Sequence, residues 1–177
     1  MTIDALEPRH LDALRRFLAA LPEGDRTFMK EDVTDPACSE AWVRGEGRAR
    51  RWVAVEEGEV VGSLFLIPLT GWSAHVGEIR VVVAEAARGR GVGRALAQFA
   101  VVQAAEAGLR KLVVEVVAEQ EPAVRMFTGL GFQGEALLGD HIRDRGGDLR
   151  DVLVLAHYMD DNWSAMASVG LSEEIEG

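Results

Sequence analysis

A basic, glycine-rich segment follows an apolar run near the middle of the chain, and its residue types suit the binding of phosphate groups. The apolar run is Val81–Val83, and the segment after it contains three arginines and three glycines: Arg88, Gly89, Arg90, Gly91, Gly93 and Arg94. Glycine lacks a side chain, so backbone N–H groups can approach a ligand closely. A helix predicted to start at Gly91 would point the positive end of its dipole at the same place. The segment therefore predicts an anion site, and a pyrophosphate is its natural ligand.

Three phosphate-binding patterns compete for this segment. A dinucleotide fingerprint needs G-x-G-x-x-G, and it fails because its last position falls on Arg94 or Leu96. A P-loop needs G-x-x-x-x-G-K followed by Ser or Thr, and the sequence has no such run. The pattern R-x-x-G-x-G is satisfied by Arg88, Gly91 and Gly93. On this motif the chain resembles the GNAT superfamily of acyl-CoA-dependent N-acetyltransferases, whose pyrophosphate loop has that pattern.

A second block downstream strengthens the resemblance. The segment from Pro122 to Phe132 is similar to the family's pattern A-[IV]-x-[LM]-[YF]-x-x-x-G-F, with matches at Ala123, Val124, Met126, Phe127, Gly131 and Phe132. The resemblance covers roughly Ile3 to Tyr158.

Residue patterning predicts the elements that must position these motifs. We expect strands over 2–5, 51–55, 60–69, 76–83, 111–117, 133–142 and 149–157, and helices over 8–21, 36–44, 91–107 and 122–130. Residues 25–33 are expected to form a polar connection. Successive strands followed by alternation predict an α/β chain with a mixed sheet. The resemblance implies the GNAT arrangement, in which about seven strands are flanked by about four helices and splayed strands form the acyl-CoA cleft.

The resemblance also implies acetyl-CoA as the co-substrate and gives roles to the motif residues. Val81 and Val83 would line the pantetheine arm through their backbone groups. The N–H of Val83 would donate to the oxyanion when an amine attacks the thioester directly through a tetrahedral intermediate. The pyrophosphate would be bound by main-chain amides of the loop, supplemented by arginine side chains, over the residues Arg88, Gly89, Arg90, Gly91, Gly93 and Arg94.

Glu78 is the candidate general base, because many relatives place a carboxylate at this point of the strand and use it through a water molecule. A base needs a pKa near neutrality, which partial burial would favour. The alternative interpretation is a strand-end glutamate paired with Arg80 or another cation. Glu115 is the second candidate, and His157 titrates in the right range but is more often structural near a strand end.

Two positions depart from the family's pattern. Phe127 stands where many relatives have a tyrosine that protonates the leaving thiolate, and Gln120 stands where many have an asparagine that contacts the pantetheine. A thiolate with a pKa near 8.5 is a tolerable leaving group without full protonation. Water or Tyr158 are the other candidates for the acid.

The acceptor is expected to be an amine, on a small molecule or on a protein or peptide. The resemblance implies that residues 25–32 and the hairpin 140–150 face it. Four carboxylates there would suit a cation, although isolated surface carboxylates are usually only solvated: Asp25, Glu31, Asp32 and Asp140. Trp42, Trp52 and Trp72 are candidates for a cleft wall, with core packing as the alternative.

Composition limits the remaining function classes. The formal charge is −10, from 19 Lys and Arg against 29 Asp and Glu, which argues against nucleic acid as a partner and favours cationic ones. Cys38 is the single cysteine and is expected to pack, and the four histidines show no metal-ligand spacing, so no metal is predicted. No apolar run could cross a membrane and the first residues lack a secretory signal, so we expect a cytoplasmic protein.

These observations predict one acetyltransferase domain over residues 1–159 and an acidic C-terminal tail over 160–177. A homodimer would be unsurprising. Two functions from different classes stay open. The first is an active N-acetyltransferase, and the second is a non-catalytic acyl-CoA-binding or regulatory module of the same fold, to which Phe127 points.

Overall fold

The computed structural model describes residues 1–27 and 29–159, so the predicted acidic tail lies outside the described residues. One sheet of seven strands has the order β1-β2-β3-β4-β5-β7-β6. Its strands are β1 (Thr2–Ala5), β2 (Arg50–Glu56), β3 (Glu59–Pro68), β4 (Val76–Val83), β5 (Lys111–Val117), β6 (Gln133–Arg143) and β7 (Leu149–Tyr158). The helices are α1 (Leu11–Ala20), α2 (Glu23–Thr27), α3 (Pro36–Val43), α4 (Val92–Glu106) and α5 (Glu121–Thr128), with 3₁₀ turns at Pro8–His10, Gly71–Ser73 and Glu85–Ala87.

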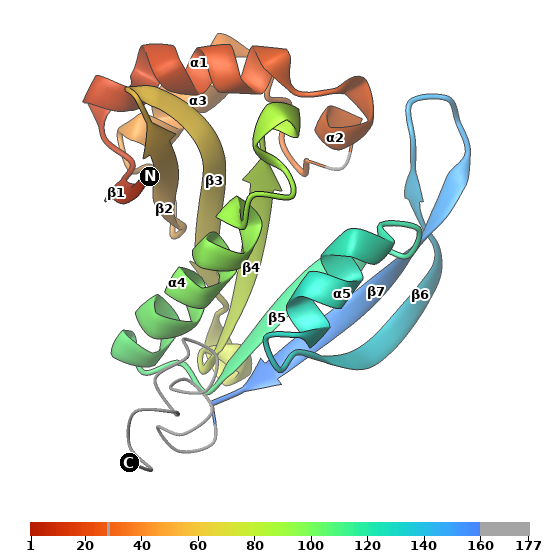
Figure 1. Ribbon diagram of the computed structural model, residues 1–177. Helices are drawn as coiled ribbons and strands as arrows, with labels where there is room; N and C mark the ends of the chain where they lie inside the picture. Colours follow the sequence, from red (N-terminus) through yellow and green to blue (C-terminus); the bar gives the residue numbers. More distant parts are fainter. Residues whose placement is uncertain (28, 160–177) are drawn as a thin grey trace.

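The sheet is antiparallel except where β4 meets β5. These two strands run parallel and pair only over Val76–Glu78 and Lys111–Val113. Beyond that point β4 stays paired with β3 as far as Val83, and β5 stays paired with β7 as far as Val117. The two halves of the sheet therefore diverge, as the arrows of β4 and β5 do in Figure 1.

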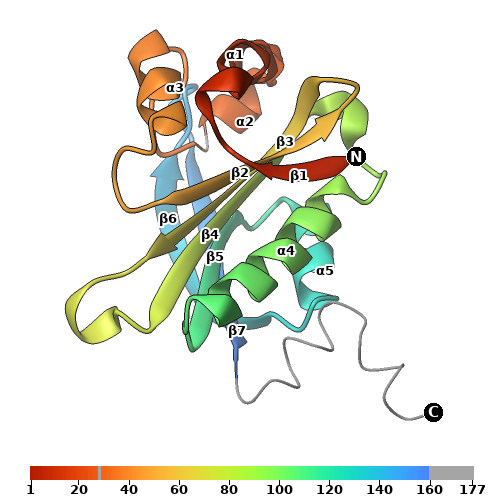
Figure 2. The ribbon, with the colours of Figure 1, turned by 90° about the vertical axis from the view of Figure 1, so that its left-hand side faces the viewer.

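Helices cover both faces of the sheet. α4 and α5 lie together on one side, and α1 with α3 lies near the other end of the molecule, as the turned view shows (Figure 2). The alternation of side chains along β3 explains how one strand serves both layers. Leu64 and Leu66 join the core beneath α4, whereas Phe65 joins the cluster formed with α1 and α3.

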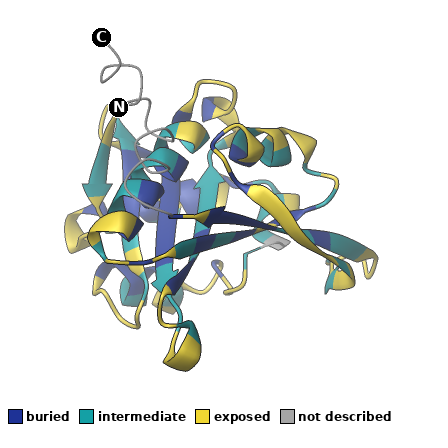
Figure 3. Ribbon diagram, turned by 90° about the horizontal axis from the view of Figure 1, so that it is seen from below, coloured by how far each residue is buried: buried dark blue, intermediate teal, exposed yellow. Residues whose placement is uncertain are grey.

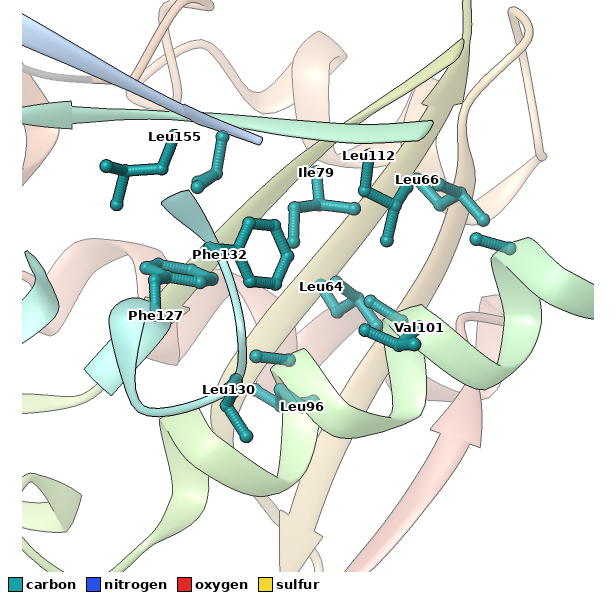
Figure 4. Close-up of a cluster of buried hydrophobic side chains, with 14 of the residues drawn as sticks. Leu64, Leu66, Ile79, Leu96, Val101, Leu112, Phe127, Leu130, Phe132 and Leu155 are labelled. Carbon is teal, nitrogen blue, oxygen red and sulfur yellow. The ribbon is translucent and has the colours of Figure 1, made fainter. Parts of the chain in front are cut away.

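The larger hydrophobic core lies between α4 and the sheet, near the point where β4 and β5 pair. Leu96 and Val101 of α4 point toward Leu64 in Figure 4, beside Ile79 of β4 and Leu112 of β5. All five side chains are almost completely buried. Burial falls off toward β6, an edge strand whose residues are mostly exposed (Figure 3).

The predicted strands are confirmed, with ends that differ by one residue or less, and the mixed α/β sheet is the expected one. The main difference lies in residues 25–33, expected to form a polar connection. α2 (Glu23–Thr27) begins just before this segment and ends within it, and the N–H groups of Asp25 and Arg26 donate to the carbonyl of Pro22. A helix of five residues is too short to show helical periodicity in the sequence.

The three tryptophans considered for a cleft wall differ in their burial. Trp42 and Trp52 are buried in the two cores, which is the packing alternative. Trp72 is 97% exposed in the 3₁₀ turn before β4. The idea that they line a cleft is wrong, because none of the three is among the residues that form the cavity described below.

Gly77 lies where β4 pairs with β5, and leucine side chains pack closely against it. Replacing Gly77 with alanine is expected to lower the free energy of unfolding by about 1–3 kcal/mol. A Cβ atom there would lie 2.8 Å from Leu109 Cδ1, 3.0 Å from Leu66 Cδ1 and 3.1 Å from Leu112 Cδ2. These leucines are buried and have little room to move. Gly134→Ala in β6 is the control, since nothing lies within 4 Å of its Cβ position. Equal urea midpoints for the two variants would contradict this account.

Candidate active site

A cavity of about 890 Å³ opens where β4 and β5 diverge. Its walls come mainly from β4, from the loop before α4 and the first turn of that helix, from β5 and from α5. Further lining residues come from α2 (Asp25), from the connection that follows it (Met29–Glu31) and from β6 (His141 and Ile142). The cavity thus collects most of the sequence-predicted site residues from segments that lie far apart in the chain.

The glycine-rich loop turns sharply into α4 and leaves space beside its backbone. Gly89 and Gly91 have φ angles of 70° and 83°, a region that side chains other than hydrogen disfavour. Gly91 is the N-cap of α4, so the first N–H groups of that helix have no side-chain cap. Nothing lies within 4 Å of a Cβ built on either glycine. The loop can therefore accept an anion against its main chain.

Gly93 is needed for a different reason. It has an ordinary helical conformation, and a Cβ there would lie 3.2 Å from Met126 Sδ and 3.4 Å from Val83 Cγ2. Its small size lets the first turn of α4 pack closely on α5 and β4. The two glycines of the R-x-x-G-x-G motif therefore serve backbone conformation at one position and close packing at the other.

The three arginines of the loop point in different directions. Arg88 donates from Nε and from an η nitrogen to the carbonyl oxygen of Val83, both at 3.3 Å, and it also bonds Asp25. Arg90 leaves the cavity and pairs with Glu56 at 2.8 Å. Arg94 lines the cavity. Arg94 is thus the loop arginine that lines the cavity without a hydrogen bond to the described part of the chain, whereas Arg88 holds the loop to β4 and α2, and the expected role of Arg90 at the anion site stays a prediction.

Backbone groups of β4 face the gap between the strands. The N–H of Ala84 donates to Val61 of β3, and the β3–β4 register is regular from Gly77 to Val83. Because successive residues of a strand direct their N–H groups to opposite sides, the N–H groups of Val81 and Val83 turn away from β3. The bond from Arg88 to the Val83 carbonyl agrees with this orientation.

Glu78 lies at the point where the strands separate, and two cations hold it. Its Oε1 atom accepts hydrogen bonds from Lys30 Nζ at 2.9 Å and from Arg80 Nε at 2.8 Å. Lys30 Nζ also lies 3.0 Å from Glu115 Oε2, and Arg80 bonds Glu31 at 2.9 Å. The five side chains form a continuous network, which we call the Glu78 network.

The electrostatics of Glu78 differ from the expectation. Burial acts to raise the pKa of Glu78, but the hydrogen bonds and charges of Lys30 and Arg80 outweigh it and hold the pKa below its ordinary value. The prediction that burial lifts this pKa toward neutrality is therefore wrong in direction. Pairing with Arg80, the alternative interpretation, describes its contacts. Glu78 is a carboxylate at neutral pH, and so is a weak base that is always in the correct protonation state.

Two other candidates for proton transfer lie away from the cavity. The His157 ring packs against Phe132, with centroids 5.1 Å apart, and burial lowers its pKa. Tyr158 donates its hydroxyl to Glu135 at 2.7 Å, beside Lys111 at the opposite end of β5 from the gap. Neither residue is part of the cavity lining. Tyr158 is therefore wrongly placed to protonate a leaving group.

Gln120 and Phe127 line the cavity from α5, as the resemblance implies. Gln120 is the N-cap residue of the helix. Phe127 is buried and packs edge-on against Phe132, with ring centroids 5.2 Å apart. The wall at this position is apolar and carries no hydroxyl group.

The acceptor-facing carboxylates divide into two groups. Asp25 and Glu31 line the cavity, but each is paired with an arginine of the site, Asp25 with Arg88 and Glu31 with Arg80. Asp32 and Asp140 lie outside it, and the Asp32 side chain accepts hydrogen bonds from Thr34. Of the four carboxylates named from the sequence, the two that line the cavity are therefore each paired with an arginine.

Met29, Lys30 and His141 line the cavity from the two segments expected to face the acceptor, although sequence reasoning assigned no individual role to any of the three. Lys30 is one of only two lysines in the chain, which is a weak indication at best. Its contact with Glu78 joins residues 48 positions apart and depends on the fold.

Metal binding, a membrane-spanning helix and a reactive cysteine are three further possibilities for residues 1–27 and 29–159. No group of His, Cys, Asp and Glu residues in this part of the chain could hold a metal ion, and none of its helices is long and apolar enough to span a membrane. Burial, with Glu31 and Asp35 nearby, raises the pKa of the Cys38 thiol to about 11, which suits a packing residue.

The Glu78 network predicts how stability depends on pH. Because the pKa of Glu78 is lowered by folding, its ion pairs stabilise the protein above the ordinary pKa and are lost as the pH falls through the folded-state pKa. Glu78→Gln should lower the free energy of unfolding at pH 7 by about 1–2 kcal/mol, since it leaves Lys30 and Arg80 less well paired. The loss of stability on acidification should then be shallower, as measured by urea unfolding between pH 7 and pH 3. Glu121→Gln, which breaks an exposed pair with Arg125, is the control, and parallel profiles for wild type and Glu78→Gln would refute the prediction.

Comparison with solved structures shows the same fold. A ribosomal-protein-alanine N-acetyltransferase from Brucella melitensis superimposes with a TM-score of 0.77 at 23% identity, over 89% of this chain and 99% of that one. A putative acetyltransferase from Salmonella typhimurium, solved with its cofactor acetyl-CoA, gives a TM-score of 0.76 at 19% identity, over 91% of this chain and 95% of that one.

Sequence comparison extends the likeness beyond the fold. The Escherichia coli (strain K12) protein described as an uncharacterized N-acetyltransferase, YjgM, is 34% identical over 103 residues. That match covers 57% of this chain and 62% of YjgM, so the chain spans less than two thirds of this relative's length. The family model described as Acetyltransferase (GNAT) family matches residues 12–132, more than half of the chain and including both motifs. The chain belongs to the GNAT acetyltransferase family.

Proposed function

We propose that this protein is an N-acetyltransferase that moves the acetyl group of acetyl-CoA to an amine. The observation that carries the proposal is the divergence of β4 and β5 beyond Glu78, with an uncapped, glycine-rich helix start at the edge of the resulting cavity. Family membership and the acetyl-CoA in the Salmonella relative support the same co-substrate.

The residues of the cavity fit acetyl-CoA as a substrate. The space beside Gly89 and Gly91 and the free N–H groups of α4 suit the pyrophosphate, with Arg94 adding positive charge. The pantetheine arm would lie between β4 and β5, with Gln120 and Phe127 on the α5 side. Its amide groups would bond the outward-facing backbone of Val81 and Val83.

The proposed reaction is a direct attack of the amine nitrogen on the thioester carbonyl carbon. A C–N bond forms as the C–S bond breaks, and the N–H of Val83 stabilises the negative charge that develops on the carbonyl oxygen. Glu78 accepts the amine's proton through a water molecule; its lowered pKa keeps it ionised at neutral pH and so ready to accept a proton, although it makes the carboxylate a weaker base. Coenzyme A leaves as a thiolate or takes its proton from water, because Phe127 cannot supply one.

A second function keeps one observation in its favour. A non-catalytic acyl-CoA-binding module would need neither a general acid nor an unpaired base, and this site has an apolar Phe127 and a Glu78 held by two cations. Binding alone does not separate the two functions, so turnover has to be measured as well.

Acetyl-CoA binding tests the loop. Calorimetric titration of the wild type should show micromolar binding, and Gly91→Glu should weaken it by at least a hundredfold, because a carboxylate would then face the pyrophosphate. Gly108→Glu is the matched control. Gly108 also has positive φ, at 72°, and also has no atoms within 4 Å of its Cβ position, but it follows the other end of α4. Absence of binding to the wild type, or equal loss in both variants, would contradict the assignment of the loop.

Turnover tests Glu78. In a thiol-release assay with a panel of primary amines, Glu78→Gln should lower kcat about a hundredfold or more while leaving acetyl-CoA affinity unchanged. Glu135→Gln is the control, since Glu135 also bonds a lysine, Lys111 at 2.5 Å, but lies outside the cavity. An unchanged rate in Glu78→Gln would remove Glu78 as the base. Binding without turnover for any amine would favour the non-catalytic module.

A further inference from the structure

One primary ammonium group already lies inside the cavity, and it belongs to the chain itself. Lys30 Nζ is 2.9 Å from Glu78 Oε1 and 3.0 Å from Glu115 Oε2, the first and second candidates for the general base. The residue next to it, Met29, lines the cavity, as do Ile142 and Phe65, and Met29 packs against the core cluster that contains Phe65. An ammonium group is thus held by two carboxylates in a cavity whose lining also includes apolar side chains.

This is the geometry that an acceptor amine would need. A base must lie within about 2.6–3.2 Å of the proton that it removes, or one water molecule away. Lys30 Nζ meets this distance to Glu78, and an amine of a substrate could not meet it at the same atom at the same time. Hydrogen bonds from Lys30 and Arg80 already converge on Glu78 Oε1.

We propose that the Lys30 ammonium occupies the acceptor's position in the free protein, and that an acceptor binds by displacing it. This inference rests on the proposed function, because it takes Glu78 to face the acceptor. It also names the acceptor class, which is a primary alkylammonium carried on a slender apolar chain, the same chemistry as the lysine side chain that it replaces.

Charge balance makes the exchange possible. The Glu78 network contains three carboxylates and two cations, Lys30 and Arg80. When one ammonium replaces another, this balance is unchanged, and Arg80 stays on Glu78. An anionic acceptor would instead leave Lys30 in place and meet three carboxylates. Lys30 is the more exposed of the two cations, at 42% against 25% for Arg80, so it is the one that solvent can receive.

The two cations also differ in how they are anchored. Arg80 lies within β4, where its backbone pairs with Phe65 of β3. Lys30 lies outside any helix or strand, on the connection between α2 and α3. Its long unbranched side chain can move away without disturbing the sheet.

Removal of the internal competitor should strengthen acceptor binding. The apparent affinity is reduced by the fraction of molecules in which the position is filled, so Lys30→Met should bind an alkylammonium about five- to tenfold more tightly. The probe is n-butylammonium chloride, titrated calorimetrically at constant ionic strength into protein saturated with coenzyme A, which carries no acetyl group and allows no turnover.

Three variants make the test specific. Lys30→Met should show the gain, and Lys30→Arg, which keeps the cation, should not. Lys111→Met is the charge-matched control because it removes the chain's other lysine, whose partner is Glu135 outside the cavity. Thermal melts of each variant check that the protein is folded.

The titration either supports or contradicts the displacement of Lys30 by an acceptor. A gain confined to Lys30→Met supports it. Equal or weaker binding in Lys30→Met, an equal gain in Lys111→Met, or no binding to any variant overturns it. A purely structural role for Lys30 would lower the melting temperature of Lys30→Met and bring no gain in binding.

The same experiment separates this inference from the proposed function. Failure of coenzyme A to bind would contradict the acetyltransferase proposal, whereas the ammonium titration is repeated without coenzyme A and is judged on its own. In the active enzyme, Lys30→Met should lower the KM for n-butylamine by the same five- to tenfold, whereas Lys111→Met should leave this KM unchanged. A lower kcat with an unchanged KM would count against displacement.

Discussion

The short parallel pairing between β4 and β5 is the constraint on which the rest of the site depends. Three residues of each strand pair, and then each strand continues with a different antiparallel neighbour, β3 for β4 and β7 for β5. Neither strand is left unsupported, so the sheet can open without unfolding. The backbone groups that face the gap are then available to a ligand. The packed leucines around Gly77 fix where the opening begins, and α4 and α5 cover the two halves from one side.

The loop at the edge of this opening combines two requirements in one short motif. Gly89 and Gly91 permit a backbone turn that leaves the first N–H groups of α4 without a side-chain cap. Gly93 lets α4 pack closely against Met126 and Val83. Arg88 holds the loop to the end of β4 through the Val83 carbonyl. The same strand end therefore carries both the anion site and the backbone groups that would face a thioester, which keeps the two at a fixed separation.

Electrostatic compensation shapes the other end of the cavity. A half-buried carboxylate is stable only with close partners, and Glu78 obtains them from Lys30 and Arg80. This compensation makes Glu78 a weaker base than an isolated buried glutamate would be. In the function proposed above, Lys30 also occupies the place of the acceptor amine. The strength of the proposed base and the access of the proposed acceptor would then both depend on Lys30.

The sequence by itself determined the family, the elements and the glycine-rich loop before α4, because these depend on local patterns. Strand alternation, helical periodicity and the spacing of Arg88, Gly91 and Gly93 are readable within short windows. The chemistry of Glu78 was not readable in this way. Its pKa is set by Lys30, 48 residues away, and the directions taken by Arg88 and Arg90 are set by Asp25 and Glu56. The tertiary structure alone decided these contacts, because charge interactions depend on distance in space, and the fold brings these groups together from segments whose local sequence carries no trace of their partners.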